Sequence, residues 1–502
     1  MDKREVIPAD EPKNILLIIA DQFRHDAFGA AGHPVVQTPN LDALAGDGVV
    51  FTNCFAQSAP CGPSRMSIYT GRYMCSTRSV NNMTPLERAD DNIGMYFRER
   101  GHHAAISGYN DYAVDPAICA PDDPRRTRLD YDNFLPGFEV VLDHEHDSRE
   151  YFDYLRSKGY PEAYCNHYAI HEPNVPPEGT GGHLPCAFPA KYRAEDSECR
   201  FHTSRVAEYL AARPSAPWFL SVNYIKPHGP LICAAPYHAM YASAPMPPPT
   251  RRPDELADPH PYVRMARRTP SLADERELHE YQAAYFGMIT ELDACLGQLF
   301  DSLKKNGYWD NTLIVFTSDH GDYLGDHYLL DKGHFYDGTM RVPCIVRDPS
   351  PEADSTRGTR IGAFVESIDI APTLFDYAGL PMPDRFQGHS FLGHVRHAPD
   401  TPARTEIHYE FDFRVLARDL PGFDPDECLI WVLRDGAFKY VQFGRADFPP
   451  ILFDLRHDPG EFDNLAGDPR HAATVAAYAQ RMLRWRMKNE DQRMERWAYS
   501  YR

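Results

Sequence analysis

A cysteine, a proline and an arginine stand close together in residues 61–65, between turn residues and an apolar stretch. Pro63 suits the first position of a helix, where its missing N–H costs nothing. The pattern therefore predicts Cys61 at a helix N-terminus, where backbone N–H groups and the helix dipole attract anions. Arg65, one turn further on, adds a fixed positive charge. The segment predicts a nucleophile facing an anionic substrate, and the alternative is a buried structural cysteine beside a turn.

A second set of polar residues follows apolar runs of strand length. Asp21 follows residues 14–20, Asp319 and His320 follow residues 313–316, and His228 comes shortly after residues 218–224. Ligands collect at the carboxyl ends of parallel strands, so these side chains are expected together. Two carboxylates and an imidazole could hold Ca²⁺, Mg²⁺ or Mn²⁺, and the imidazole favours Mn²⁺ over Mg²⁺. Taken singly, each aspartate would be a cap or turn residue.

The strands and helices that must position these residues alternate along the chain. Residues 14–20, 48–51, 218–224 and 313–316 have the continuous apolar pattern of buried parallel strands. Residues 280–305 have the spacing of a long amphipathic helix that Asn306 and Gly307 close. Thr38 is the expected N-cap of a short helix starting at Pro39. The alternation predicts an α/β sandwich with a large, mostly parallel central sheet.

The pattern changes after about residue 404. Residues 406–413 alternate, residues 429–433 and 438–443 flank a turn, and residues 471–488 form a helical pattern. We therefore expect a catalytic α/β domain over residues 1–403 and a small α+β subdomain, a hairpin sheet with one helix, over residues 404–502. Residues 231–275, rich in proline and charge, are expected to cross the surface as a lid or an oligomer contact.

The net charge, the apolar runs and the number of cysteines exclude several classes of protein. The formal charge of -20 over 502 residues, without a clustered basic patch, argues against nucleic-acid binding. Residues 1–5 lack the layout of a signal peptide, and no apolar run is long enough to cross a membrane. The eleven cysteines are an odd number without a C-x-x-C pair, so no disulfide framework is indicated. These features predict a cytoplasmic protein without nucleic-acid or membrane partners.

The motif of Cys61, Pro63, Ser64 and Arg65 resembles the Cys-x-Pro-Ser/Ala-Arg signature of the sulfatase family. The resemblance continues in order from about residue 14 to residue 466, through residues 317–327, Lys332, and residues 341–343, 367–374 and 452–465. It implies an alkaline-phosphatase-like fold and conversion of Cys61 to formylglycine by a generating enzyme. It also implies one divalent metal ion, Ca²⁺ or Mn²⁺, held by Asp21, Gln22, Cys61, Asp319 and His320.

Departures from the common family pattern bear on the substrate. Gln22 and His320 stand where many sulfatases have aspartate and asparagine, and Tyr109 and Asp111 replace a lysine and a histidine. This combination looks most like the branch of phosphonate monoester hydrolases and arylsulfatases. Losing two potential cations should disfavour doubly charged phosphate monoesters and favour monoanionic esters. Asp111 would repel an anion if ionised and close; otherwise it points away or acts as a base.

The resemblance also implies roles for individual residues. Hydrated formylglycine at position 61 would attack sulfur or phosphorus, and Asp319 would accept its proton. Arg65, Asn82 and Lys332 would hold the anionic oxygens and the hydrate. His228 would protonate the leaving oxygen, and Tyr109 would donate a hydrogen bond.

The leading interpretation is an arylsulfatase with promiscuous activity. The alternatives are a phosphonate monoester hydrolase or phosphodiesterase on the same scaffold and a non-catalytic anion-binding protein whose Cys61 stays unmodified. Family relatives are often oligomeric, so a homodimer or homotetramer is expected.

Overall fold

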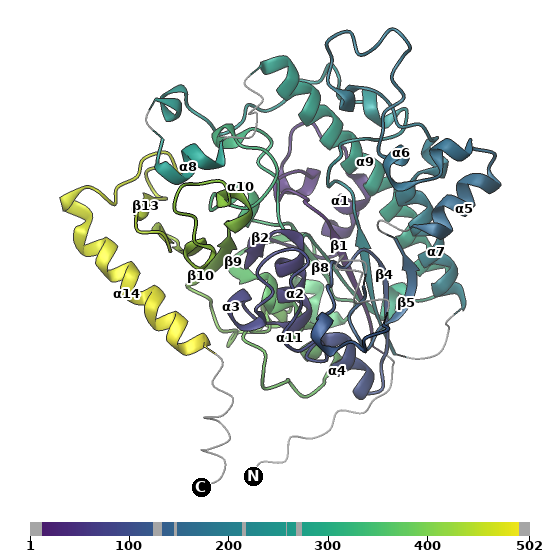
Figure 1. The fold of residues 1–502 in the computed structure, drawn as a ribbon. Coiled ribbons are helices and arrows are strands. Elements are labelled where there is room, and N and C mark those ends of the chain that lie inside the picture. Colours follow the sequence, from purple (N-terminus) through teal and green to yellow (C-terminus); the bar gives the residue numbers. More distant parts are fainter. Residues whose placement is uncertain are drawn as a thin grey trace, which may run out of the picture.

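The computed structural model describes residues 13–123, 133–144, 148–212, 217–257, 259–267 and 274–490. Residues 1–5, used in the signal-peptide prediction, and residues 491–502 of the predicted C-terminal subdomain lie outside these ranges. The main sheet has eight strands in the order β5-β4-β6-β1-β7-β8-β2-β9 (Figure 1). All neighbours are parallel except β8, which is antiparallel to β7 and β2. The strands are β1 Asn14–Ala20, β2 Val49–Phe55, β4 His103–Gly108, β5 Glu139–Asp143, β6 Trp218–Tyr224, β7 Thr312–Thr317, β8 Cys344–Arg347 and β9 Thr359–Glu366.

The three central strands end level with one another. Ala20 of β1 pairs with Tyr224 of β6, and Ile19 of β1 pairs with Thr317 of β7. The polar residues that follow these strands therefore leave the sheet at one edge, as expected from the sequence. Each of the three strands is buried along its whole length, which explains its continuous apolar sequence.

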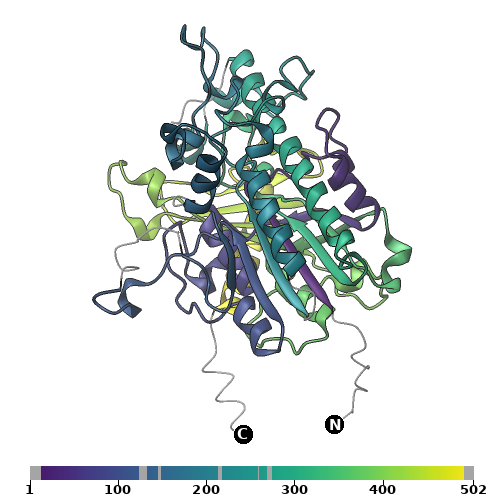
Figure 2. The same cartoon turned by 90° about the vertical axis from the view of Figure 1, so that its right-hand side faces the viewer.

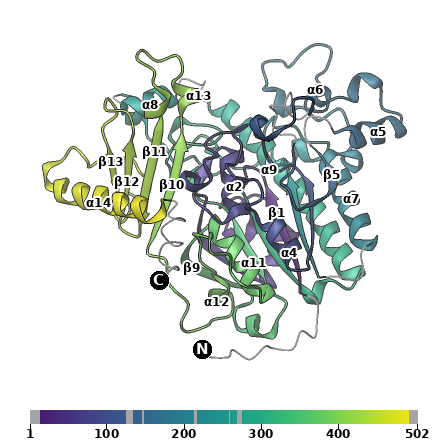
Figure 3. The ribbon, with the colours of Figure 1, turned by 60° about the horizontal axis from the view of Figure 1, so that its bottom comes forward.

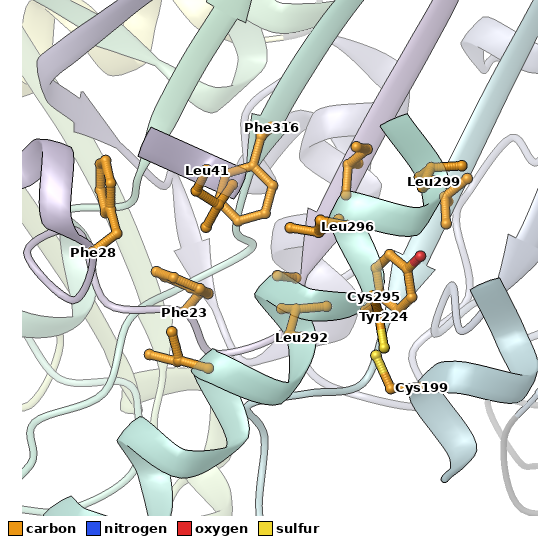
Figure 4. Packing of buried hydrophobic residues seen from close by; sticks show 14 of the residues in the cluster. Phe23, Phe28, Leu41, Cys199, Tyr224, Leu292, Cys295, Leu296, Leu299 and Phe316 are labelled. Atoms are coloured by element: carbon orange, nitrogen blue, oxygen red, sulfur yellow. The ribbon is translucent and has the colours of Figure 1, made fainter. Parts of the chain in front are cut away.

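Helices cover both faces of this sheet. Leu16 and Ile18 of β1 face a core shared with α1, α7 and α9, whereas Ile15 and Leu17 face a core shared with α2, α4 and α11. Figure 2 shows the long helix α9 lying across the strands. Figure 4 shows Leu292, Leu296 and Leu299 of α9 packed near Leu41 and Phe316. The helices are α1 Pro39–Gly46, α2 Cys61–Thr70, α4 Ile93–Glu99, α7 Glu198–Ala212, α9 Glu275–Lys305 and α11 Ile370–Ala378.

A second, five-stranded sheet has the order β13-β12-β11-β10-β3 and lies beside the main sheet, with α14 against it (Figure 3). Four strands come from the C-terminal α+β part of the chain, but β3 ends at Ala59, two positions before Cys61, and pairs parallel with β10. The C-terminal sheet therefore anchors the segment that leads to the cysteine. The elements are β3 Ser58–Ala59, β10 Glu406–Asp412, β11 Leu429–Asp435, β12 Phe438–Phe443, β13 Ile451–Asp454 and α14 Ala472–Asn489.

The remaining helices are short, apart from α5. None of the helices within the described ranges is long and apolar enough to span a membrane. Part of the proline-rich segment packs inside the molecule, because Tyr262 and Val263 of α8 share a core with the C-terminal sheet. These helices are α3 Met74–Thr77, α5 Arg149–Ser157, α6 His167–Ile170, α8 Pro261–Ala266, α10 Asp337–Met340, α12 Leu392–Val395 and α13 Arg414–Ala417.

Three local predictions need correction. Helix α2 begins at Cys61, so Pro63 is its third residue and not its first. Thr38 is at the N-cap position of α1, but its hydroxyl donates to Asp42 and accepts from the Gly29 N–H instead of capping. Helix α9 begins five residues earlier than predicted because the Asp274 carboxylate caps it, accepting from the N–H groups of Arg276 and Glu277.

Candidate active site

Cys61 is the first residue of α2 and is buried, with 1% of its surface exposed. The next residue, Gly62, donates its backbone N–H to Asn82 Oδ1 at 2.9 Å, so the Asn82 side chain covers the start of the helix. The predicted helix N-terminus is confirmed, and the thiol stands where the helix dipole favours an anion.

Arg65, one turn along α2, is completely buried and makes hydrogen bonds on all sides of its guanidinium group. Nε donates to Asp319 at 2.9 Å, and one terminal nitrogen donates to Asp21 at 3.0 Å. The other terminal nitrogen donates to the Tyr109 carbonyl and to Asn223 Oδ1. The Tyr109 ring stacks against the same group, 4.5 Å from its carbon. Arg65 therefore neutralises and orients two carboxylates, besides adding charge to the pocket.

Four buried side chains form a cluster that suits a metal ion. Ligand atoms of Asp21, Cys61, Asp319 and His320 all lie within 4.8 Å of one another. His320 Nε2 is 3.3 Å from Cys61 Sγ, 3.7 Å from Asp21 Oδ1 and 3.9 Å from Asp319 Oδ1. His320 Nδ1 lies 3.0 Å from the Gly321 carbonyl, so this nitrogen holds the proton and Nε2 presents its lone pair to the cluster. Burial also lowers the pKa of His320, which favours the neutral imidazole that a metal requires.

The pKa values of the two carboxyl groups in the cluster, Asp21 and Asp319, shift in opposite directions. Burial raises the pKa of Asp21 to about 7, with further contributions from the nearby Asp319 and Cys61. Burial acts in the same direction on Asp319, but Arg65 and His320 more than offset it and lower its pKa. Negative groups that crowd together here add to the effect of burial on Asp21, and a divalent cation between them would relieve their repulsion. The donor set of carboxylates and imidazole therefore fits the expected metal ion.

Gln22 lies at the edge of the cluster in the left-handed backbone region, with φ of 63°. Its Nε2 donates to Asp322 Oδ2 at 2.6 Å, which leaves Oε1 facing Lys332 Nζ at 3.3 Å. The amide oxygen, which is the atom of Gln22 that could bind the predicted metal ion, thus faces into the pocket. Non-glycine residues with positive φ are strained, and such strain is common at functional sites.

Lys332 and His228 face Cys61 from the opposite side. Lys332 Nζ is 3.2 Å from Cys61 Sγ and 2.5 Å from His228 Nε2. His228 Nδ1 lies 2.6 Å from the Gly229 carbonyl, so Nδ1 carries a proton and Nε2 faces Lys332. Burial and Lys332 lower the pKa of His228, but Asp21 and Cys61 outweigh them and raise it to about 9. Burial raises the pKa of the Cys61 thiol, but Lys332 and His228 reverse that effect and bring it down to about 7. The structure thus gathers all the predicted site residues around position 61.

Some neighbours were not predicted from the sequence. Asn223 binds both Arg65 and Tyr69, Asp322 orients Gln22, and Ser64 donates to the Asp319 carbonyl at 2.5 Å. Asn223 leaves a detectable signal, because it is a polar residue near the end of an otherwise apolar strand. Asp322 and Ser64 lie in the recognised motifs, but their contacts depend on the fold.

Comparisons of the sequence with known proteins give matches over nearly the whole chain. The sulfatase family model matches residues 13–380, and a model of the C-terminal part of N-sulphoglucosamine sulphohydrolase matches residues 325–488. A multifunctional alkaline phosphatase superfamily protein, PehA of Trinickia caryophylli, is 38% identical over 97% of this chain and 98% of its own. An arylsulfatase of Clostridium perfringens is 26% identical over 92% of each.

Two solved structures have the same fold over nearly their whole length. The phosphonate monoester hydrolase of Agrobacterium radiobacter matches with a TM-score of 0.86 and 35% identity, covering 95% of this chain and 96% of its own. The phosphonate monoester hydrolase of Silicibacter pomeroyi matches with a TM-score of 0.87 and 35% identity, covering 96% of each. The fold is alkaline-phosphatase-like, and the chain belongs to the sulfatase family.

Proposed function

We propose that this protein hydrolyses singly charged esters with formylglycine at position 61 and one divalent metal ion. Phosphonate monoesters are its preferred substrates and aryl sulfates its second substrate class. The sequence alone put aryl sulfates first. The order is reversed because the two hydrolases with the same fold at 35% identity act on phosphonate monoesters. The arylsulfatase of Clostridium perfringens, at 26% identity over most of the chain, supports the second class.

The charge balance around position 61 is the observation that supports this proposal. Arg65 is fully engaged by Asp21 and Asp319, and Tyr109 contributes no cation. Lys332 is the cation whose amino group lies against Cys61. Because two carboxylates neutralise Arg65, the side-chain positive charge beside position 61 comes from Lys332 and His228, and the pocket suits an anion of one charge better than an anion of two.

Asp21, Gln22, Asp319, His320 and the group at position 61 would hold the metal. When bound, the metal supplies a Lewis acid for an anionic oxygen and lowers the pKa of a hydroxyl at position 61. Formylglycine supplies an aldehyde whose hydrate offers one hydroxyl for attack and one for release of the product.

The chain's own side chains bind the ester and move its protons. Lys332 Nζ and the Asn82 amide lie on two sides of position 61 and can hold the non-bridging oxygens. The pKa of His228 is raised to about 9, so His228 Nε2 can carry a proton of its own and pass it to the leaving oxygen while Lys332 stays charged. Arg65 keeps Asp319 ionised, so Asp319 can accept a proton.

The test compares kcat/KM for an aryl phosphonate monoester and an aryl sulfate with the same leaving group. Mass spectrometry of the tryptic peptide of residues 25–65 first establishes that position 61 carries the aldehyde. We expect turnover of both esters, with the phosphonate preferred, and none by the variant Cys61→Ala. A thiol at position 61 in the native host, or turnover that survives Cys61→Ala, would refute the proposal.

A further inference from the structure

Asp111 is a buried acid beside the nucleophile that the reaction above does not use. It follows β4, is 3% exposed and has φ of 56°, in the left-handed region. Neither oxygen of its carboxyl group has a hydrogen-bond partner of good geometry among the described residues, although the Tyr109 side chain lies close enough to affect it. A buried carboxyl group with such limited hydrogen bonding is costly, so its place calls for an explanation.

The carboxyl group points toward the nucleophile. A Cβ built on Gly62 would lie 3.2 Å from Asp111 Oδ2 and 3.2 Å from Asn82 Oδ1. Two oxygens therefore flank the residue next to Cys61, one from each loop. The possibility that Asp111 points away from the site is thus excluded.

Asp111 offers a bound anion no positive charge in either protonation state. As a carboxylate it repels an anion in proportion to the anion's charge, and as an acid it contributes one neutral donor. Burial, together with the nearby Cys61, raises the pKa of this carboxyl group. On the facing side, Arg65 is already shared between Asp21 and Asp319, so its charge offsets the Asp111 carboxylate only in part.

We propose that Asp111 is a specificity-determining residue, which contacts the transferred group and selects singly charged esters over doubly charged phosphate monoesters. The inference rests on the proposed function, because it concerns the same pocket. It assigns the preference for singly charged esters to the Asp111 side chain and to the negative charge that its carboxyl group can carry.

The experiment measures kcat/KM for an aryl phosphonate monoester and an aryl phosphate monoester with the same leaving group. We expect Asp111→Asn, which keeps the shape of the side chain and removes its charge, to shift the ratio about tenfold toward the phosphate at a pH above the raised pKa of the Asp111 carboxyl group, and to leave the ratio unchanged at a pH below it. Asp111→Ser is a second variant if the amide does not fold. The matched control is Asp115→Asn, which removes an acid from the same segment and keeps the cap on the Ala117 N–H; its ratio should equal that of the unmodified chain.

A binding measurement separates recognition from turnover. In metal-loaded Cys61→Ser protein, calorimetry gives Kd for an aryl sulfate and an aryl phosphate, with and without Asp111→Asn. We expect the second substitution to tighten phosphate binding relative to sulfate binding. A kcat/KM ratio that Asp111→Asn leaves unchanged at every pH, or unchanged relative affinities, would overturn the inference while leaving the proposed function intact. If the unmodified chain hydrolyses neither class of ester, the proposed function itself fails.

Discussion

Lys332 Nζ lies 3.2 Å from Cys61 Sγ, although 271 residues separate the two in sequence. The contact forms because α2 and the loop after β7 meet at the carboxyl edge of the main sheet. It gives position 61 a cation that is largely shielded from water, with 14% of the Lys332 side chain exposed. Such a preorganised charge acts far more strongly there than at the surface.

Lys332→Met should lower kcat/KM for both ester classes about 100- to 1,000-fold, which is typical of losing one charge-stabilising donor. Lys332→Arg should recover part of the rate, since it restores the charge but not the shape. Lys304, exposed at the end of α9, provides the control Lys304→Met with an unchanged rate. A rate loss of less than about threefold in Lys332→Met would show that the contact is not used in the reaction.

Removal of the metal should abolish activity and lower the Tm, because the acids of the cluster would then repel one another. Adding back Mn²⁺ or Ca²⁺ should restore both, and at a hundredfold excess over Kd the metal should stabilise the fold by about 2.7 kcal/mol. His320→Ala should raise the metal concentration needed. Full activity after exhaustive chelation, checked by metal analysis of the same sample, would contradict the assignment of the cluster.

Gly108→Ala should destabilise the protein by about 1–3 kcal/mol and misplace Tyr109. Gly108 has φ of 86°, and an added Cβ would lie 2.1 Å from the Asn223 carbonyl oxygen and 2.5 Å from His202 Cε1. Thermal unfolding measures the effect, and Gly46→Ala, whose Cβ would meet no atom within 4 Å, is the control. Equal Tm values for the two variants would show that the backbone adjusts without cost.

Lys226 and Glu291 form a buried ion pair, 2.6 Å apart, and removing either partner alone should destabilise the protein. Lys226→Met alone should cost about 3–5 kcal/mol because it leaves a buried charge without its partner, and Glu291→Gln should behave similarly. The double variant Lys226→Met with Glu291→Leu should recover most of that loss. Chemical denaturation of the four proteins forms a double-mutant cycle, and additive losses would show that the two residues act independently.

Stability should depend on pH through Glu410, a buried acid of β10 whose carboxyl group accepts from the Cys75 N–H. Burial raises its pKa from an ordinary 4.5 to about 6, so between these values the folded chain holds a proton that the unfolded chain has released. Stability from this group is therefore full below pH 4.5 and is lost as the pH rises past 6. Glu410→Gln should remove the loss and gain about 2 kcal/mol at pH 8 relative to the unmodified chain.

The measurement is Tm against pH for Glu410→Gln beside Glu427→Gln, a control at an exposed position on the same sheet domain. Parallel curves for the two variants from pH 4.5 to pH 8 would be inconsistent with a raised pKa at Glu410.

The sequence by itself determined the local features of this protein. Runs of apolar residues located β1, β6 and β7, because a strand buried on both faces has a continuous apolar sequence. Residues 61–65 indicated both a helix start and a reactive position, since capping and charge act within a few residues. The order of strands and polar ends also predicted that Asp21, Asp319 and His320 would meet.

Only the tertiary structure decided how distant segments complete the site. The pairing of β3 with β10 links the approach to Cys61 to the C-terminal sheet, and no local pattern marks a two-residue strand. The orientation of Asp111 was open in the sequence because a carboxyl group after a strand can face solvent or pocket. Packing against Gly62 fixes it. Contacts of this kind depend on the relative placement of loops, which side-chain periodicity does not encode.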